Sequence, residues 1–269
     1  MRRTRLWILA AFTLSTIAIV FLLPRIPQDP AYHQFADQRT FFEIPNCLNV
    51  ISNAPFLLVG VLALAFLFRC QSAGEKAAFS NPLERWPYAV FFLGVALTSV
   101  GSTYYHLAPS NNTLIWDRLP MTVAFVSFFA AVVAERISLK AGMWLLPPLI
   151  LIGIGSVAYW NLTEMHGRGD LRPYGYVQGY PLLGVPLLIA LFPPAYTRTV
   201  DLLAVGGIYV VAKLFELFDR PIFDLGHFVS GHTLKHLAAA LSGYWALRML
   251  QLRVPCGARL KNAVPVTLA

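Results

Sequence analysis

Charged residues are scarce in this chain. Asp, Glu, Lys and Arg together make up 13% of its 269 residues, whereas a soluble globular domain carries about 25%. Hydrophobic residues make up 57%, and many apolar runs are long enough to cross the roughly 30 Å hydrocarbon layer of a bilayer as helices. The composition therefore excludes an ordinary soluble fold and predicts an all-α, polytopic membrane helix bundle.

Cysteine is also rare, and acidic residues are outnumbered by basic ones. Cys47, Cys70 and Cys256 lie far apart and form no C-x-x-C pair, which excludes a thiolate zinc knuckle and a dithiol redox motif. The net charge of +8 does not indicate nucleic acid, because the basic residues form no stripe and lie in the short segments between apolar runs. The expected partner is the membrane, and no nucleic acid.

The chain lacks a low-complexity linker or repeat, so one membrane domain is expected. Met1-Arg-Arg-Thr-Arg precedes an apolar stretch from Leu6 to Leu23 that is long for a signal peptide and is followed by no small-x-small cleavage site. We therefore predict a retained signal-anchor helix added to a seven-helix core. The mixed, proline-containing segment 25–46 is expected at the membrane interface. The predicted spans are 6–24, 47–68, 86–107, 114–135, 143–161, 175–194, 200–219 and 228–249.

The basic residues predict the orientation of these eight spans. With the N-terminus in the cytoplasm, 13 Lys and Arg residues fall in inner segments and 6 in outer segments, while Lys213 and Lys235 lie within spans. Basic residues are enriched in cytoplasmic loops, so both termini are expected inside and the 162–174 loop outside.

Histidines near span ends predict a metal site. His232 and His236 are four residues apart, which places both imidazoles on one face of a helix, in the geometry by which one helix supplies two ligands. His106 is the best candidate for a third ligand, because the predicted topology brings all three histidines to the outer side. Isolated H-x-x-x-H pairs also occur by chance in helices. A catalytic zinc site needs three protein ligands and leaves a fourth position for water.

Other polar residues in the spans are functional candidates, because polar groups are costly in a membrane. Ser102 lies on the same face as His106, and Asp117 follows His106 by eleven residues, at the same predicted depth. Each also has a structural interpretation: Ser102 as a hydroxyl bonded to its own helix, Asp117 as a carboxylate at a helix start. Lys213 and Glu216 are explained as well by an intramembrane ion pair.

These residues resemble a known family. S-x-x-x-H, an aspartate eleven residues later and H-x-x-x-H in the last span resemble the alkaline ceramidases, within the superfamily that also holds the progestin and adiponectin receptors. The resemblance runs from about Phe35 to Leu250, and its flanking sequences look like those of the bacterial ceramidase-domain branch. The signature residues here are Ser102, His106, Asp117, His232 and His236.

The resemblance implies an intramembrane zinc hydrolase that cleaves the amide of ceramide, or a similar lipid, into a sphingoid base and a fatty acid. Its implied zinc ligands are His106, His232 and His236, with Asp117 and Ser102 as catalytic residues beside Zn²⁺. The bacterial branch also implies a bacterial inner-membrane protein, and the predicted topology places the site toward the outer face. The corresponding organisation is a signal-anchor helix over 1–30, a ceramidase-like membrane domain over 31–250 and a cytoplasmic tail over 251–269.

Further residues are predicted to lie near the metal site or to bind calcium. Asp219 is a candidate to orient a ligand histidine, and Arg172 to contact a lipid headgroup. The animal enzymes carry a calcium loop before the first core helix; here only Asp37 and Glu43 remain as oxygen ligands for calcium, and Asn46 replaces an acidic ligand.

Two rival functions are also considered. A zinc-containing receptor would signal through inner loops, which are short here. A transporter would use Lys213, Glu216 and Lys235 as a relay and is typically built from inverted repeats, of which the sequence has none.

Overall fold

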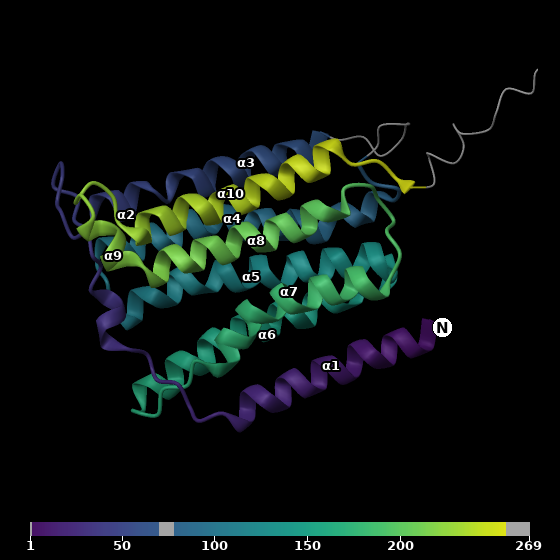
Figure 1. The fold of residues 1–269 in the computed structure, drawn as a ribbon, viewed down its shortest axis with the longest axis horizontal. Helices are drawn as coiled ribbons and strands as arrows, with labels where there is room; N and C mark the ends of the chain where they lie inside the picture. The colour runs from purple at the N-terminus through teal and green to yellow at the C-terminus, as the bar shows by residue number, and fades with distance from the viewer. Residues whose placement is uncertain (1, 70–77, 257–269) are drawn as a thin grey trace, which may run out of the picture.

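The protein is a bundle of long α-helices, described by a computed structural model for residues 2–69 and 78–256 (Figure 1). The described part contains no β-strand, which confirms the predicted all-α class. In chain order the elements are α1 (Arg2–Leu22), η1 (Pro30–His33), α2 (Cys47–Ile51), α3 (Ala54–Arg69), η2 (Pro82–Glu84), α4 (Arg85–Leu107), α5 (Asn111–Arg136), α6 (Leu139–Met165), α7 (Arg172–Leu191), α8 (Thr199–Leu217), α9 (Asp219–Asp224) and α10 (Gly231–Leu252).

Six of these segments are long and apolar enough to cross a membrane: α1, α2 with α3, η2 with α4, α5, α6 and α7. Helices α8 and α10 are of similar length, with 19 and 22 residues, but carry the charged and histidine side chains discussed below. Each of the eight predicted spans thus corresponds to a long helix. The protein is an integral membrane protein, as its composition predicts.

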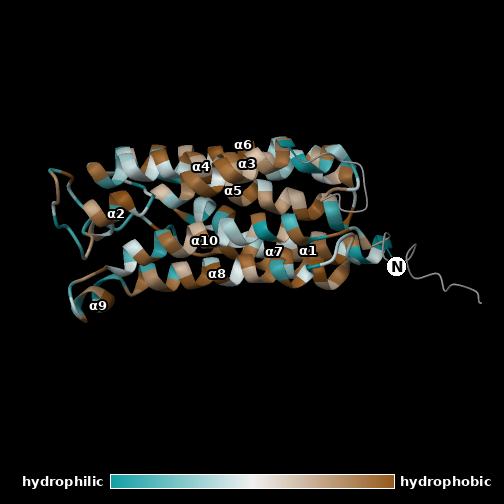
Figure 2. Cartoon of the chain, turned by 90° about the horizontal axis from the view of Figure 1, so that it is seen from above, coloured by the Kyte–Doolittle hydropathy of each residue, from teal (hydrophilic) through white to brown (hydrophobic). Residues whose placement is uncertain are grey.

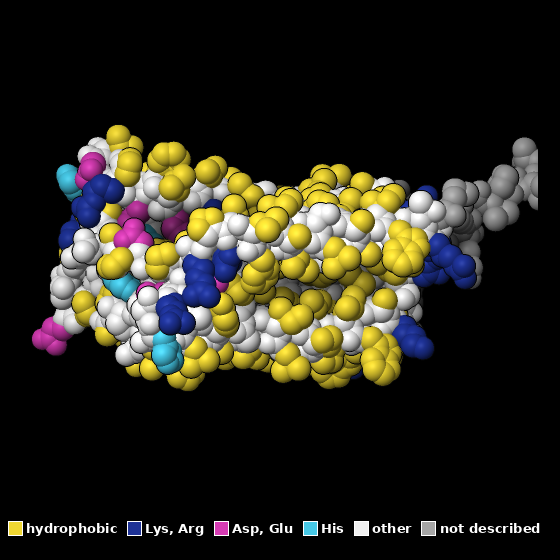
Figure 3. All heavy atoms as spheres, turned by 90° about the horizontal axis from the view of Figure 1, so that it is seen from below, with side chains coloured by type: hydrophobic (Ala, Val, Ile, Leu, Met, Phe, Trp, Pro, Cys, Tyr) yellow, Lys and Arg dark blue, Asp and Glu magenta, His cyan; other side chains and the backbone are white. Residues whose placement is uncertain are grey.

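Hydrophobic residues occupy much of the length of the helices, and many residues of the connecting loops at the ends are hydrophilic (Figure 2). The space-filling view in Figure 3 shows hydrophobic side chains along the middle of the bundle, while acidic and histidine side chains gather at the end that carries α2 and α9. This distribution suits a bundle that meets hydrocarbon along its sides and water at its ends.

Helix α1 lies at the edge of the bundle against α7, and none of its residues is buried (Figure 1). Two hydroxyl pairs join these helices, Thr13 with Tyr180 at 2.5 Å and Thr16 with Tyr176 at 3.0 Å. The arrangement agrees with the prediction of an added helix on a seven-helix core. Of the predicted tail, residues 257–269 lie outside the described residues, as do Cys70 and the basic residues Lys76, Arg259 and Lys261.

Several boundaries differ from the predicted spans. Helix α6 continues to Met165 and α7 already begins at Arg172, so the loop between them is shorter than predicted. Helix α10 begins at Gly231 rather than at residue 228, because the Ser230 hydroxyl caps it by accepting a hydrogen bond from the Thr233 N–H. The short helix α9 was not predicted, since six residues carry too little periodicity to be recognised.

Candidate metal centre

Three histidines from two helices meet at the end of the bundle that carries α2 and α9. His106 lies in the last turn of α4, and His232 and His236 lie in the first two turns of α10. Their candidate ligand nitrogens all lie within 4.8 Å of one another, and the three side chains are buried. Among the described residues this is the one group of three or more His, Cys, Asp or Glu that could hold a metal ion. The predicted convergence of these histidines is confirmed.

The imidazole rings face a common point edge-on instead of stacking. Every pair of ring centroids is 4.8 to 4.9 Å apart, with interplanar angles of 64° to 87°. The Nε2 atoms of His106 and His236 are 3.2 Å apart. Two nitrogens bound to one tetrahedral zinc at about 2.0–2.1 Å would be about 3.3 Å apart, so this pair is already close to ligand spacing.

The hydrogen bonds of His236 direct its Nε2 lone pair toward this point. The Ser52 hydroxyl donates to the Asn49 carbonyl at 3.0 Å, and its oxygen lies 2.8 Å from His236 Nδ1. Because the hydroxyl proton is already used, Nδ1 must be the donor to Ser52, which leaves Nε2 unprotonated. Metal-binding histidines are commonly fixed in this way through the other ring nitrogen.

His232 supplies an independent test of whether a metal fits. Its Nε2 is buried and has no hydrogen-bond partner among the described residues. A buried polar atom without a partner is costly, and a metal ion at the common point would satisfy it. The donor set of three neutral imidazoles fits zinc.

Asp219 positions His232 through the backbone N–H of His232 and not through the imidazole ring. One carboxylate oxygen accepts the His232 N–H at 2.7 Å, and the other accepts the Ala36 N–H at 2.9 Å. Gly231 makes this approach possible, since a Cβ there would lie 2.2 Å from the Phe215 carbonyl oxygen and 2.7 Å from Asp219 Cα. The predicted orienting role of Asp219 therefore takes a different form: it fixes the first turn of α10, which carries the ligand.

Asp117 is brought to the centre by a close approach of α4 and α5. A Cβ on Gly101 would lie 2.0 Å from the Trp116 carbonyl oxygen, so only glycine fits there. Pro120 has no N–H to bond that carbonyl within the helix. The start of α5 is fixed by a capping box between Ser110 and Thr113.

Ser102 and Asp117 lie together beside the triad. Both side chains are buried, with exposed fractions of 2% for Ser102 and 5% for Asp117. Both also line the cavity that His236 lines. The structure thus brings together all five residues that the sequence singled out.

The cavity next to these residues is elongated and mostly apolar. Its volume is about 270 Å³, and it is lined by residues of α3, α4, α5, α7, α8 and α10. Its α5 wall runs from Asp117 to Phe128, about 16 Å at the helical rise of 1.5 Å per residue. Polar side chains gather at the Asp117 end, and the remainder could enclose a hydrocarbon chain.

Comparison with known proteins does not assign a family: no protein-family model matches the chain, and no curated protein matches it at a significant level. The site is therefore described by its own geometry.

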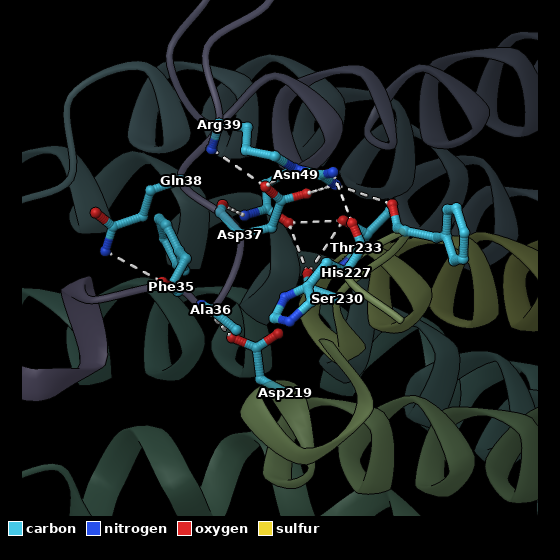
Figure 4. Close-up of polar contacts among 11 residues, drawn as sticks. Phe35, Ala36, Asp37, Gln38, Arg39, Asn49, Asp219, His227, Ser230 and Thr233 are labelled. Carbon is cyan, nitrogen blue, oxygen red and sulfur yellow. Dashed lines mark hydrogen bonds and ion pairs between the residues drawn. The ribbon is translucent and has the colours of Figure 1, made fainter. Parts of the chain in front are cut away.

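A strap formed by residues 35–39 lies against the start of α9 and the loop before α10 (Figure 4). The Phe35 ring packs on the rings of His106 and His232, with centroids 4.6 and 4.8 Å away, and is 2% exposed. The Arg39 guanidinium donates to the carbonyls of His227 and Phe228, at 2.6 and 2.9 Å. The Phe35 ring therefore covers two of the three imidazoles, while the third, that of His236, lines the cavity.

The strap contains Asp37, one of the two predicted calcium ligands. Both Asp37 oxygens accept hydrogen bonds from the Arg39 side chain at 2.8 Å. Burial alone would raise the pKa of the Asp37 carboxyl, but these bonds, the Arg39 N–H and the guanidinium charge hold it below its usual range. Glu43 is exposed, at a turn where its φ is 62°. Asp37 is thus engaged by a cation of the chain, and the geometry gives no support to a calcium site.

Arg172 is not brought to the centre. Its guanidinium donates to Asp170 at 2.8 and 2.7 Å and to the carbonyls of Phe21 and Leu23 at 3.1 and 2.5 Å. The hydrogen bonds from Arg172 hold the pKa of the Asp170 carboxyl below its usual range. Arg172 therefore ties the end of α1 to the start of α7 and has a structural role in place of the predicted one.

Four residues around the centre were not predicted from the sequence to belong to the metal site. Phe35 covers two ligands, Ser52 holds the third, and Asn49 links Asp37 to Thr233 and the start of α10. Lys235 lines the cavity beside His236. The first three come from the segment before α3 and lie more than 50 residues from their partners on α4 and α10, so no local pattern indicates them.

Proposed function

We propose that the protein is an intramembrane zinc-dependent hydrolase that cleaves the amide bond of ceramide or a ceramide-like lipid. The observation that carries the proposal is the buried group of His106, His232 and His236 at one end of an apolar cavity that Ser102 and Asp117 also line. Metal ligands, an acid–base candidate and a site for a hydrocarbon chain are thereby adjacent.

The proposed metal is zinc, held by the three imidazoles. Bound there, zinc would polarise the amide carbonyl and make water acidic enough to lose a proton near neutral pH. Three protein ligands with a free coordination position are typical of catalytic zinc sites, whereas structural sites have four.

Asp117 and Ser102 have separate roles in the proposed reaction. Asp117 accepts a proton from the attacking water and later delivers it to the leaving nitrogen. Ser102 donates a hydrogen bond to the carbonyl oxygen as negative charge develops on it. The water oxygen bonds to the carbonyl carbon and the carbon–nitrogen bond breaks, which yields a fatty acid and a free amine.

The cavity supports a lipid substrate. Its length of about 16 Å along α5 suits an acyl chain, and its polar end carries the groups that would meet an amide. These features agree with the resemblance of the five signature residues to the alkaline ceramidases, and we propose membership of that family on this basis.

Two other functions remain less well supported. A receptor of the related superfamily would retain the same metal site, and no observation here favours signalling. A transporter would need a polar path through the bundle, but Lys213, Glu216 and Lys235 are bonded to one another at one end of a cavity whose described lining is otherwise mainly apolar.

The test is incubation of the purified full chain with a panel of lipids, with and without a chelator, read by mass spectrometry. We expect release of a sphingoid base and a fatty acid from ceramide, loss of this release with the chelator, and recovery on addition of Zn²⁺. Hydrolysis that persists without metal, or no hydrolysis of any lipid amide, would count against the proposal.

We further propose a bacterial inner-membrane location with both termini in the cytoplasm, supported by the bias of 13 basic residues against 6. The metal centre then lies toward the outer face. Reporter fusions should place the C-terminus inside and the loop between α6 and α7 outside. A C-terminus outside the cell would reverse the assigned face of the centre.

A further inference from the structure

Two lysines face the polar end of the cavity, and this feature is not needed for the hydrolysis described above. Lys213 of α8 and Lys235 of α10 both line the cavity, next to Ser102, Asp117 and His236. Ammonium groups within membrane spans are rare because they are costly there, and they commonly mark a site for a ligand or ion.

Both ammonium groups share one carboxylate. Lys235 donates to one Glu216 oxygen at 2.5 Å, and Lys213 is bonded to the other oxygen. The Tyr32 hydroxyl also donates to Glu216, at 3.0 Å. Glu216 does not line the cavity. Its single negative charge therefore compensates one of the two ammonium charges from outside the cavity lining.

A metal ion at the triad would give the polar end of the cavity an excess of positive charge. Asp117 is the one carboxylate among the lining residues, and it neighbours the buried guanidinium of Arg118, which stacks on the rings of Trp160 and Tyr174 at 4.2 and 4.6 Å. Three cations, Lys213, Lys235 and Arg118, therefore stand against three carboxylates, Asp117, Glu216 and Asp219. A divalent ion on the three neutral imidazoles would leave this end of the cavity with a net positive charge. Uncompensated charge in a low-dielectric site favours a ligand group of the opposite sign.

We propose that this centre also cleaves lipid amides that carry a carboxylate on the amine half, as in an N-acyl amino acid, that it prefers them to uncharged lipid amides, and that Lys213 and Lys235 bind the carboxylate. The inference rests on the proposed hydrolase function and names its substrate class. Lys235 directly precedes His236 and lines the same end of the cavity. A carboxylate one carbon from the scissile nitrogen therefore comes to the ammonium groups when the acyl chain fills the apolar part. Ceramide offers only hydroxyl groups at this position.

The test compares two substrates with the same acyl chain, N-dodecanoylglycine and N-dodecanoylethanolamine, which differ in the carboxylate. We expect the wild-type protein to favour the glycine conjugate in kcat/KM by at least about tenfold, the contribution of one hydrogen bond between charged groups. Lys213→Met and Lys235→Met should each lower this ratio toward one. Lys140→Met, an exposed lysine of α6 outside the cavity, is the control and should keep the ratio.

The two lysine variants are suited to this test because neither leaves Glu216 without a cation. Each substitution retains the ion pair between Glu216 and the other lysine. A wild-type ratio of one or less, or a high ratio that both lysine variants retain, would overturn the inference while the hydrolase proposal stands.

Binding without turnover separates this inference from the proposed function. With metal removed, N-dodecanoylglycine should raise the unfolding temperature of the full chain more than N-dodecanoylethanolamine, and Lys213→Met should abolish the difference. If neither amide is hydrolysed but this difference is observed, the carboxylate site stands and the hydrolase proposal fails. If the two ligands stabilise the protein equally, the carboxylate site is refuted.

Discussion

Purified wild-type protein is expected to contain about one zinc per chain, and His232→Ala about none. The remaining ligands, His106 and His236, come from different helices and would hold an ion by two nitrogens only. The buried Nε2 of His232 has no hydrogen-bond partner among the described residues. Replacing His232 therefore removes one metal ligand and breaks no hydrogen bond of that nitrogen. The measurement is metal content by elemental mass spectrometry.

The matched control for this loss is His166→Ala. His166 is an exposed histidine at the end of α6, and its ring bonds only the Leu162 carbonyl of its own helix among the described residues. This variant should keep the wild-type zinc content. An unchanged zinc content in His232→Ala would remove His232 from the ligand set, and wild-type protein that takes up no zinc would refute the metal centre.

The parts of the fold that were predicted from the sequence follow from local patterns. The eight long helices correspond to the eight predicted spans, and six of these segments are long and apolar enough to cross a membrane. The i, i+4 spacing of His232 and His236 fixes their common face, and alternating helix direction brings His106 to the same end. These inferences need only the geometry of a helix and the number of times the chain crosses the membrane.

The remaining features depend on contacts between distant segments. Ser52 and His236 are 184 residues apart, and Ala36 and Asp219 are 183 apart. No periodicity predicts that the strap carrying Phe35 folds back over the histidines. For the same reason the sequence predicts that Arg172 contacts a lipid headgroup, whereas its guanidinium donates to the carbonyls of Phe21 and Leu23 at the end of α1, which local patterns cannot place.

Replacement of Asp117 by asparagine is expected to leave the zinc content unchanged and to lower lipid-amide hydrolysis by about 10²- to 10⁴-fold, the usual contribution of general acid–base catalysis. Zinc should stay because three histidines already supply the protein ligands of a catalytic site. Asparagine keeps the shape of the buried side chain beside Ser102 but removes the basic oxygen. The assay is release of fatty acid from ceramide at saturating zinc.

Two further variants separate the roles around this carboxylate. Ser102→Ala should also keep zinc and lose about 10²- to 10³-fold in rate, the usual cost of one donor to the developing oxyanion. Asp224→Asn changes an exposed carboxylate of α9 at the same end of the bundle and should hydrolyse the lipid as the wild type does. Because both aspartate variants lose one negative charge, a loss confined to Asp117→Asn cannot come from the net charge.

The zinc content of Asp117→Asn decides between three roles for this carboxylate. A wild-type rate with zinc retained would make Asp117 structural, and the proton acceptor would have to lie elsewhere in the cavity. Loss of zinc would make it a ligand or a support for one, which its position at the start of α5, held against Gly101 of α4, allows. Loss of rate with zinc retained is the result that an acid–base residue requires, because only the proton transfer depends on the oxygen that asparagine lacks.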